Sequence, residues 1–494
     1  IEMGYIYGVN PKVLVPIFAE VHNLLAHPDL VELELSLDDD GFNVKRTASQ
    51  LINTVNMKYD TEKALNKAVV EILQQLLDFV KIELHFVVPD GNNRPATEID
   101  WVAFCLTAHG WLCIPFSGEG KKRRGAGGDS ILQNFCALQR LLALRPDLRN
   151  FMRLTACPML MLSIEGTDMR VWGMYFGAEI HGSRLFDASL RLDLTARQRH
   201  RVALKLQIIR NTVRKLCDFY ACLHGSTRPP TAPFLFPQPL ALLDCLIPRP
   251  PPEVVDHLAS LDLHFLNNID TSKHPGRSLY RGVIFPPDSN VEPGISVYIK
   301  IVPGKYGAAA HNLLARHNPP LAPKLFWCHE ILVGYTMVVM AELSVPFGRT
   351  DAHPREREPE DIQIVERDIG NALQVLHAAD IVHGDVRQPN IIISDGHAYL
   401  IDFDSADVVG VAEYPPSLNP LVRWPGDPKR LVSMPIRKEH DNDRFQWTLD
   451  ELNGLSVPLP AAGQQVVRST RNSMRKMSDS LSLQWLVRMV PIKD

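Results

Sequence analysis

The sequence lacks the cysteine patterns of a disulfide framework or a zinc site. Its eight cysteines are scattered singly through 494 residues, with no CxxC pair and no metal-ligand spacing to histidine. This usage is typical of a reducing compartment, so we expect an intracellular protein, cytoplasmic or nuclear. A secreted protein is the alternative, if a signal segment precedes Ile1.

Long apolar runs are also missing. The longest nearly apolar stretch, near residues 154–164, falls short of the roughly 20 residues that span a bilayer. We therefore expect a soluble chain with no membrane partner. The net charge of −4 does not by itself indicate a polyanion partner.

Charge is unevenly distributed along the chain. Residues 1–55 carry 3 Lys/Arg against 8 Asp/Glu, whereas residues 56–228 carry 24 against 17. An N-terminal acidic segment of unassigned role therefore precedes a basic domain. A basic domain of this kind suits a polyanion such as DNA, and uneven surface charge without a partner is the alternative.

Proline marks a boundary after the basic domain. Nine of the 24 residues from 229 to 252 are proline, which predicts an extended linker at 229–254 that forms neither helix nor central strand. A second domain at 255–455 and a Ser/Arg-rich tail at 456–494 follow it.

Apolar periodicity predicts a mixture of helices and strands in both domains. In the first domain the predicted helices are 62–77, one beginning near Ser130, and 196–222, and the predicted strands are 99–106, 111–116, 159–164 and 171–176. In the second domain the predicted helices are 308–316 and 362–377, and the predicted strands are 279–285, 296–302, 324–331 and 336–340.

The strongest pattern in the sequence joins three polar residues through an apolar hairpin. The triplet HGD ends at Asp385, Asn390 follows it, and the triplet DFD begins at Asp402. Phosphoryl transfer needs a carboxylate that orients the attacking hydroxyl, and oxygen ligands that hold Mg²⁺ against the nucleotide phosphates. Asp385 is the predicted base, and Asn390 and Asp402 are the predicted metal ligands.

This stretch resembles the catalytic loop of the kinase superfamily, in the HGD form of aminoglycoside and choline kinases. The resemblance implies that ATP is bound between two lobes. It implies that Lys300 holds the nucleotide phosphates, and that Met340, Glu342 and Leu343 belong to the hinge that meets adenine. An ordinary exposed strand lysine is the alternative for Lys300.

Two features of an active kinase are missing. No GxGxxG loop precedes Lys300, and no acidic residue lies between Lys300 and Glu330 to form the usual ion pair. Two functions therefore stay open: a phosphotransferase acting on a substrate such as a protein, or a nucleotide-binding pseudokinase that regulates the other domain or a protein partner. The intact base Asp385 favours catalysis. Asp441 either braces the catalytic loop or caps a surface helix.

A second group of polar residues lies in the basic domain. Asp100 opens one predicted strand, Glu119 and Lys121 follow the next, Glu62 lies on the helix before them and Gln133 on the helix after them. Two carboxylates that hold Mg²⁺, with a lysine that stabilises developing charge, can hydrolyse a phosphodiester. The group predicts a nuclease site, and ordinary surface charges are the alternative because an ExK triplet alone is common.

Several motifs together resemble the nuclease and kinase fusion of fungal crinkler-like (CRN) effectors. They are Gly118-Glu119-Gly120-Lys121, the segments 127–133 and 321–325, the HGD triplet, and the ordered Tyr-Pro-Pro, Trp-Pro and His-Asp between 414 and 441. The resemblance implies a multidomain chain, α/β plus α+β. In it a restriction-endonuclease-like α/β domain with a PD-(D/E)xK site precedes a two-lobed protein-kinase-like domain. It also implies action on DNA through residues 56–228, with ATP and Mg²⁺ as cofactors.

Overall fold

The computed structural model shows a mixed α/β protein. It describes residues 11–27, 43–89, 95–108, 110, 112–123, 130–144, 155–176, 180–223, 236–269, 278–287, 294–343, 359–415, 418–419 and 422–455. The chain divides into two compact units. The first comprises Ile1–Ile295, Ile299–Pro303 and His329–Met337, and the second comprises Ser296–Tyr298, Gly304–Cys328 and Val338–Asp494. The proline-rich segment therefore lies within the first unit.

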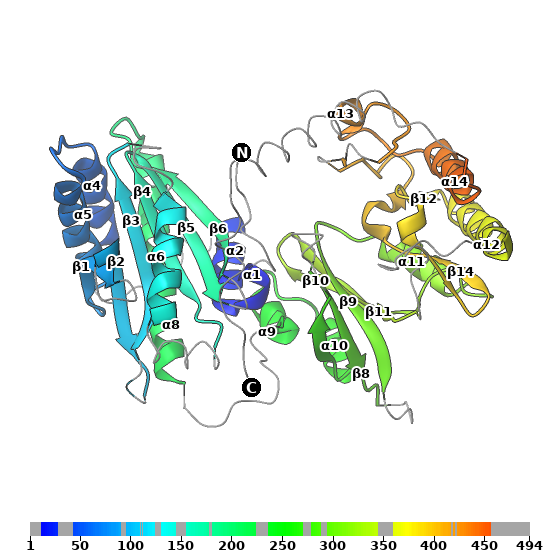
Figure 1. The fold of residues 1–494 in the computed structure, drawn as a ribbon, viewed down its shortest axis with the longest axis horizontal. Helices are drawn as coiled ribbons and strands as arrows, with labels where there is room; N and C mark the ends of the chain where they lie inside the picture. The colour runs from blue at the N-terminus through cyan, green and yellow to red at the C-terminus, as the bar shows by residue number, and fades with distance from the viewer. Residues whose placement is uncertain are drawn as a thin grey trace. The chain divides into compact units, whose positions relative to one another are not determined.

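Six strands form the first sheet, in the order β1-β2-β3-β4-β5-β6 (Figure 1). Their bounds are Ile82–Pro89, Pro95–Leu106, Leu112–Lys121, Met159–Glu165, Asp168–Phe176 and Ile180–Ser189. Neighbouring strands are antiparallel except β3 and β4, which are parallel because α6 (Ser130–Leu144) carries the chain back across the sheet. The predicted strands of this domain are confirmed within β2, β3, β4 and β5, with Trp111 outside the described residues, whereas β1 and β6 were not predicted.

Helices cover both faces of this sheet. α6 covers one face, where Ser117 on β3 donates a hydrogen bond to Asn134. α5 (Glu62–Leu76) covers the other, because a side chain added at Gly120 of β3 would meet Asn66 of α5. α4 (Val44–Val55) packs against both α5 and α8 (Ala196–Ala221).

Side-chain caps explain where two of these helices begin. Thr61 accepts a hydrogen bond from the N–H of Ala64 ahead of α5. Thr195 and Gln198 form a reciprocal capping box ahead of α8. The predicted helices 62–77 and 196–222 are confirmed to within one residue.

Part of the acidic N-terminal segment packs onto the first unit. α1 (Pro11–Leu14) contacts β5 and β6, and α2 (Pro16–Ala26) contacts β6 and α8. Asn23 is fully buried: its side-chain nitrogen donates to the oxygen of Cys245 at 2.8 Å, and its side-chain oxygen accepts from the N–H of Val333 at 3.1 Å. The predicted boundary at residue 55 thus separates helices that pack together.

Two short helices lie in or next to the proline-rich segment. α9 (Pro239–Asp244) and α10 (Pro252–Ser260) each begin with proline. The expectation that this segment forms no helix was wrong at these positions. Proline is compatible with the first helical turn, where its missing N–H leaves no hydrogen bond unmade.

The second sheet has five strands, in the order β10-β11-β9-β8-β7. In chain order from β7 to β11 they are His264–Asn268, Ser278–Ile284, Ile295–Pro303, Leu325–Leu332 and Tyr335–Ala341. α11 (Ala308–Ala315) follows β9. All of these elements except β7 were predicted.

A loop-rich region follows the second sheet. It contains α12 (Pro359–Ala378), β12 (Ile381–Val382), β13 (Ile391–Ser394), β14 (His397–Leu400), β15 (Asp407–Val408), α13 (Pro428–Leu431) and α14 (Lys438–Leu452). β13 and β14 form the predicted hairpin, closed by Asp395 and Gly396, which both have left-handed backbone angles.

All eight cysteines carry free thiols, and two of them, Cys136 on α6 and Cys222 after α8, are exposed.

Among the helices that the structure describes, none is long and apolar enough to cross a membrane.

Candidate functional sites

Four of the residues predicted for a nuclease site come together near the end of β3. The carboxylate of Asp100 on β2 accepts a 2.9 Å hydrogen bond from the N–H of Gly120. Nζ of Lys121 lies 3.1 Å from Oε1 of Glu119 and 3.9 Å from Oε2 of Glu62, the first residue of α5. Two strands and one helix therefore supply the group.

The glycines on either side of Glu119 leave room for side chains on the opposite face of the sheet. A Cβ atom at Gly118 would lie 2.4 Å from Trp101, and one at Gly120 would lie 2.0 Å from Asn66. Because alternate residues of a strand face opposite sides, Glu119 points to the side of the sheet that α6 covers.

Burial makes the carboxyl groups of Asp100 and Glu119 hard to ionise. Glu119 is 6% exposed, and burial, followed by the charge of Asp100, raises its pKa to about 7. Burial also raises the pKa of Asp100, although hydrogen bonds from Gly120 and Asn66 oppose the shift. Oε2 of Glu119 is buried and has no hydrogen-bond partner in the described part of the chain. These features fit a divalent cation with oxygen ligands.

Gln133 was the fifth predicted residue, and it is exposed on α6. A different residue anchors this helix to the sheet. The hydroxyl of Ser130 donates to Oε1 of Glu165 at 2.6 Å and lies 2.7 Å from the hydroxyl of Ser163 on β4. The sequence analysis assigned no role to this buried network.

Two further neighbours of Asp100 were not predicted. Nδ1 of His85 on β1 lies 3.9 Å from Oδ1 of Asp100 and 2.6 Å from Oε1 of Glu98 on β2. Glu98 is two residues before Asp100, a spacing that places both on one face of a strand and could have indicated it. His85 gave no such signal, because β1 itself was not predicted.

In the second unit, hydrogen bonds bring Asp385, Asn390 and Asp402 together. Nδ2 of Asn390 donates to the backbone oxygen and to Oδ2 of Asp385, both at 2.8 Å, so its amide oxygen is the atom left to bind a cation. The N–H of Ile401 donates to the backbone oxygen of Asn390 at 2.9 Å, which brings the next residue, Asp402, beside it. Asp402 has left-handed backbone angles, which only a few per cent of non-glycine residues adopt.

Two buried side chains hold the loop that carries the HGD triplet. The carboxylate of Asp441 on α14 accepts from the N–H groups of His383, at 2.7 Å, and Gly384, at 2.8 Å. The N–H of Asp385 donates to Nδ1 of His383 at 3.2 Å, so the ring proton is on Nε2, which donates to the oxygen of Ile401. Burial lowers the pKa of His383 and keeps the ring neutral. Asp441 is confirmed as a brace of the loop and is not a surface cap.

Two arginines that the sequence analysis did not single out contact Asp385. Nη2 of Arg444 on α14 lies 2.6 Å from Oδ1, and Nε of Arg387 lies 3.0 Å from Oδ2. The side chain of Arg444 is 2% exposed and its guanidinium lies 4.3 Å from the ring centre of Trp424. The side chain of Arg387 is 28% exposed. Arg444 is therefore fixed, whereas Arg387 can move.

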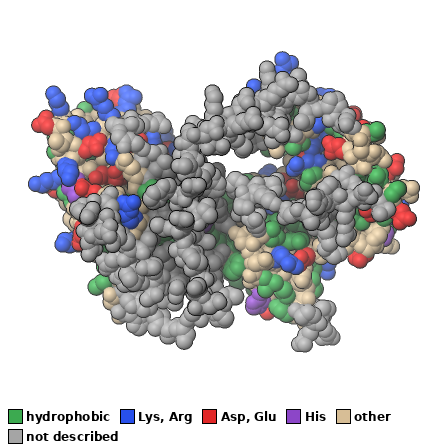
Figure 2. Space-filling model, in the orientation of Figure 1, with side chains coloured by type: hydrophobic (Ala, Val, Ile, Leu, Met, Phe, Trp, Pro, Cys, Tyr) green, Lys and Arg blue, Asp and Glu red, His purple; other side chains and the backbone are tan. Residues whose placement is uncertain are grey.

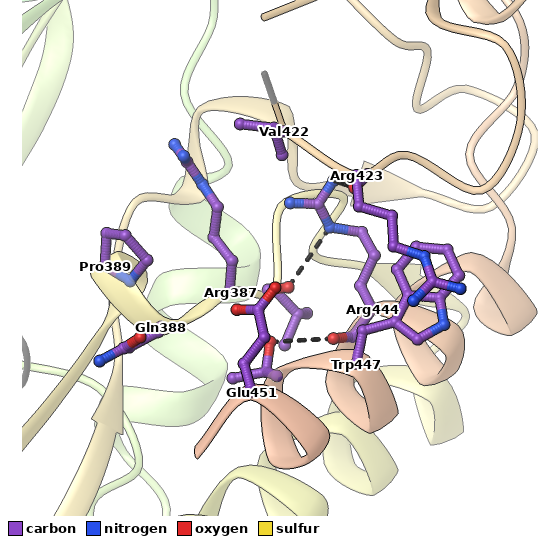
Figure 3. Close-up of a pocket in the computed structure, with 10 residues that line it drawn as sticks. Arg387, Gln388, Pro389, Val422, Arg423, Arg444, Trp447 and Glu451 are labelled. Atoms are coloured by element: carbon purple, nitrogen blue, oxygen red, sulfur yellow. Dashed lines mark hydrogen bonds between the residues drawn. The ribbon is translucent and has the colours of Figure 1, made fainter. Parts of the chain in front are cut away.

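A cavity of about 250 Å³ opens beside these arginines (Figure 3). The guanidinium of Arg423 lies 4.0 Å from the ring centre of Trp447 in its wall. The lining residues are Val386, Arg387, Gln388, Pro389, Val422, Arg423, Arg444, Trp447, Thr448 and Glu451. The cavity thus adjoins the predicted base.

Two of the residues predicted to bind ATP, Lys300 and Met340, lie on neighbouring strands of the second sheet, and Glu342 and Leu343 follow the second of these strands. Lys300 is half-buried on β9, and Met340 is near the end of β11. The N–H of Glu342 donates to the oxygen of Ser296 at 3.0 Å, ahead of Leu343. Lys300 belongs to the first compact unit, whereas Met340, Glu342 and Leu343 belong to the second.

α11 is the helix that the kinase resemblance expects to carry an acidic residue, and its buried polar residue is His311. Nδ1 of His311 lies 2.9 Å from the hydroxyl of Tyr306, and Nε2 lies 2.8 Å from the oxygen of Pro323. The ring stacks on Phe403 with 4.7 Å between ring centres. His311 therefore braces the DFD triplet instead of replacing a carboxylate.

No protein-family model and no curated protein matches the chain. Among solved structures, the chain has a distant likeness to the kinase PK-1 of Cydia pomonella granulovirus. The likeness covers 42% of this chain and 75% of that one, with 19% sequence identity and a TM-score of 0.31. At this TM-score the likeness does not establish a shared fold.

Proposed function

We propose that the second domain, residues 255–455, is an ATP- and Mg²⁺-dependent phosphotransferase of protein-kinase-like, two-lobed fold. The observation that carries this proposal is the hydrogen-bonded placement of Asp385, Asn390 and Asp402, because phosphoryl transfer depends mainly on positioning. Asn390 and Asp402 would hold Mg²⁺, which offsets phosphate charge when it is bound. Lys300 would contact the phosphates, and the strand end at Met340 would meet adenine.

Asp385 and the two arginines beside it have different roles at the acceptor hydroxyl. Asp385 orients the hydroxyl and accepts its proton, and the buried Arg444 keeps the carboxylate in place. Arg387 is exposed enough to turn from Asp385 to a phosphate, since a guanidinium binds either anion. The adjoining cavity would receive the acceptor, for example a protein side chain.

Transfer of the γ-phosphate from labelled ATP tests this role. Asp385→Asn is expected to lower transfer by at least about 100-fold, because general acid–base catalysis is worth that much. Asp395→Asn is the matched control, since Asp395 is exposed in the β13–β14 turn and asparagine tolerates its left-handed backbone. Equal transfer by wild type and Asp385→Asn would remove Asp385 as the base.

A nucleotide-binding pseudokinase is the alternative, and the absence of acidic residues between Lys300 and Glu330 favours it. Two measurements, stabilisation by ATP and Mg²⁺ and transfer of phosphate, distinguish the pseudokinase from the phosphotransferase. Stabilisation of the fold by ATP and Mg²⁺ without phosphate transfer would establish a switch that regulates the first unit or a protein partner. If ATP and Mg²⁺ neither stabilise the protein nor support phosphate transfer, both the phosphotransferase and the pseudokinase hypotheses are wrong.

A second activity, metal-dependent cleavage of DNA by the restriction-endonuclease-like domain at 56–228, is favoured by a separate observation. The predicted residues Glu62, Asp100, Glu119 and Lys121 are spread along the sequence but lie close together in the structure. The buried Oε2 of Glu119 has no hydrogen-bond partner in the described part of the chain. Asp100 and Glu119 would hold Mg²⁺, and Lys121 would stabilise charge on the phosphate. Figure 2 shows Lys and Arg side chains interspersed with acidic ones over α4, α5 and β1. The resemblance to crinkler-like effectors extends this activity to DNA inside a nucleus.

Cleavage of plasmid DNA in Mg²⁺ or Mn²⁺ tests the nuclease. Lys121→Ala is expected to lower cleavage by at least about 100-fold, as loss of one charge-stabilising group does. Lys122→Ala is the matched control, because Lys122 is the exposed neighbour of Lys121 and its Nζ donates to the backbone oxygen of Asp60. Wild-type protein that leaves the plasmid intact in both metals would remove the nuclease.

A further inference from the structure

Three side chains on β1 and β2 form a cluster of which the proposed nuclease site uses Asp100 alone. Nδ1 of His85 lies 2.6 Å from Oε1 of Glu98 and 3.9 Å from Oδ1 of Asp100. One ligand atom from each residue lies within 4.8 Å of those of the others. Ligands about 2.0–2.2 Å from a metal ion stand roughly 3 Å apart, so the two distances bracket the spacing that an ion would impose.

The backbone at this cluster is unusual. His85 has φ of +55° in the middle of a strand, and the pairing of β1 with β2 passes from Leu84 opposite Trp101 to Phe86 opposite Ile99. The residue between them is turned out of the regular ladder. Left-handed backbone at a non-glycine residue persists where the surroundings require it, commonly at a ligand site.

Several buried atoms around Asp100, Oδ1 of Asn66 among them, have no hydrogen-bond partner among the described residues. Two of them lie on possible metal ligands. They are Nδ1 of His85, whose short contact with Glu98 lacks hydrogen-bond geometry, and Oε2 of Glu119. The Glu119 side chain is 8% exposed, and Glu119 is coupled to the charge of Asp100. Acceptor atoms that are buried without a donor are the atoms that a cation would satisfy.

We propose that His85, Glu98 and Asp100 bind a second divalent transition-metal ion, and that Asp100 is shared between this ion and the one held with Glu119. One imidazole with two carboxylates suits Mn²⁺ or a similar ion better than it suits Mg²⁺. Solvent reaches the cluster, because the side chains of His85, Glu98 and Asp100 are 20%, 35% and 15% exposed. Lys63, 3.5 Å from Glu98 and 70% exposed, can turn away as the ion enters. The ion's part in cleavage rests on the proposed nuclease, whereas its binding does not.

Titration of the full chain with Mn²⁺ alone, without nucleotide, tests the site. Wild type is expected to bind one more equivalent than His85→Asn or Glu98→Gln. Asparagine at position 85 tolerates a left-handed backbone, so that variant keeps the strand conformation. Glu83→Gln, on the same strand but outside the cluster, is the matched control and keeps the wild-type stoichiometry.

Electron spin-echo spectroscopy of the bound Mn²⁺ gives a readout that does not depend on activity. Coupling to an imidazole ¹⁴N nucleus is expected in wild type and in Glu119→Gln, and it is expected to vanish in His85→Asn. Coupling in a wild-type protein that does not cut DNA would uphold the site and remove the nuclease. Unchanged stoichiometry in both cluster variants, or the absence of ¹⁴N coupling in wild type, would overturn the site and leave the nuclease standing.

Discussion

Glu119 is a buried carboxylate whose charge costs free energy in the metal-free protein. Its pKa is raised from 4.5 to about 7, first by burial and then by Asp100. The folded state therefore binds a proton more tightly than the unfolded state does. The stability that this proton contributes is fully present below about pH 4.5 and is lost as the pH rises through about 7.

Glu119→Gln is expected to raise the free energy of unfolding of the metal-free protein by up to about 3 kcal/mol at pH 8, and to change it little at pH 4.5. Glutamine removes the ionisation and keeps the size of the side chain. Urea denaturation with a chelator at the two pH values measures the difference. Glu71→Gln, exposed on α5, is the control. A gain of equal size at both pH values would contradict the explanation.

Gly384 shows what the sequence could and could not indicate about a single position. The HGD triplet indicated a catalytic loop, but not why glycine occupies its centre. In the structure Gly384 has φ of +81°, and a Cβ atom there would lie 2.8 Å from Ile436 and 2.9 Å from Ser405. Both neighbours are distant in sequence, so only the folded chain reveals the constraint.

At the scale of elements, one face of α14 supports the loop that carries the HGD triplet. Asp441 and Arg444 on this helix are buried and bind three consecutive residues of the loop, His383 to Asp385. The helix and the loop therefore form one structural element, although 53 positions separate the last of these loop residues from the start of the helix.

Asp441→Ala is expected to lower the free energy of unfolding by about 3 kcal/mol, because it leaves two buried N–H groups without an acceptor. It should also abolish stabilisation by ATP and Mg²⁺, since the loop that carries Asp385 loses its support. Thermal melting with and without nucleotide measures both effects. Asp443→Ala, exposed on the same helix, should behave as wild type. If Asp441→Ala melts like wild type, the loop keeps its conformation without the hydrogen bonds to Asp441.

Elements with a strong apolar period were predicted well, and elements without one were missed. α5, α8 and α12 carry apolar residues at helical spacing, and β4 is buried along its whole length. β6 alternates poorly because Gly182, Ser183 and Arg184 interrupt it, and β1 contains the left-handed His85. α9 and α10 were obscured by the prolines that begin them.

At the scale of the whole molecule, the packing of α2 and α4 decides where the first domain begins. Both helices contact α8, and Asn23 of α2 satisfies the backbone groups of Cys245 and Val333. Removing them would expose apolar surface on α8 and leave these backbone groups unpaired. The acidic composition of residues 1–55 gave no indication of this role.

A chain that begins at residue 56 is therefore expected to melt at least about 10 °C below one that begins at residue 11. Scanning calorimetry of the two truncated chains measures the difference, and limited proteolysis is expected to cut the shorter one faster. Equal melting temperatures would mean that α2 and α4 are accessory to a core complete without them.

Site residues that lie close together in the sequence or on adjacent strands could be predicted, and site residues contributed by other elements could not. Asp385, Asn390 and Asp402 flank one hairpin, and Asp100, Glu119 and Lys121 lie on adjacent strands, so local pattern was enough. Arg444, His85 and Asn66 reach these sites from other elements. Their side chains carry no motif, and only the folded chain brings them near.

The distribution of the cysteines allows metal or DNA binding by the first unit to be followed with a dye. Burial raises the pKa of the Cys157 and Cys328 thiols to about 12, so these groups stay protonated and react slowly. A maleimide dye would instead attach to the exposed thiols of Cys136 and Cys222. Cys136 lies one helical turn beyond Gln133 on α6, the helix that covers the carboxylate face of the sheet. With Cys222 replaced by serine, one dye on the native Cys136 would report in real time when metal or DNA arrives beside that helix.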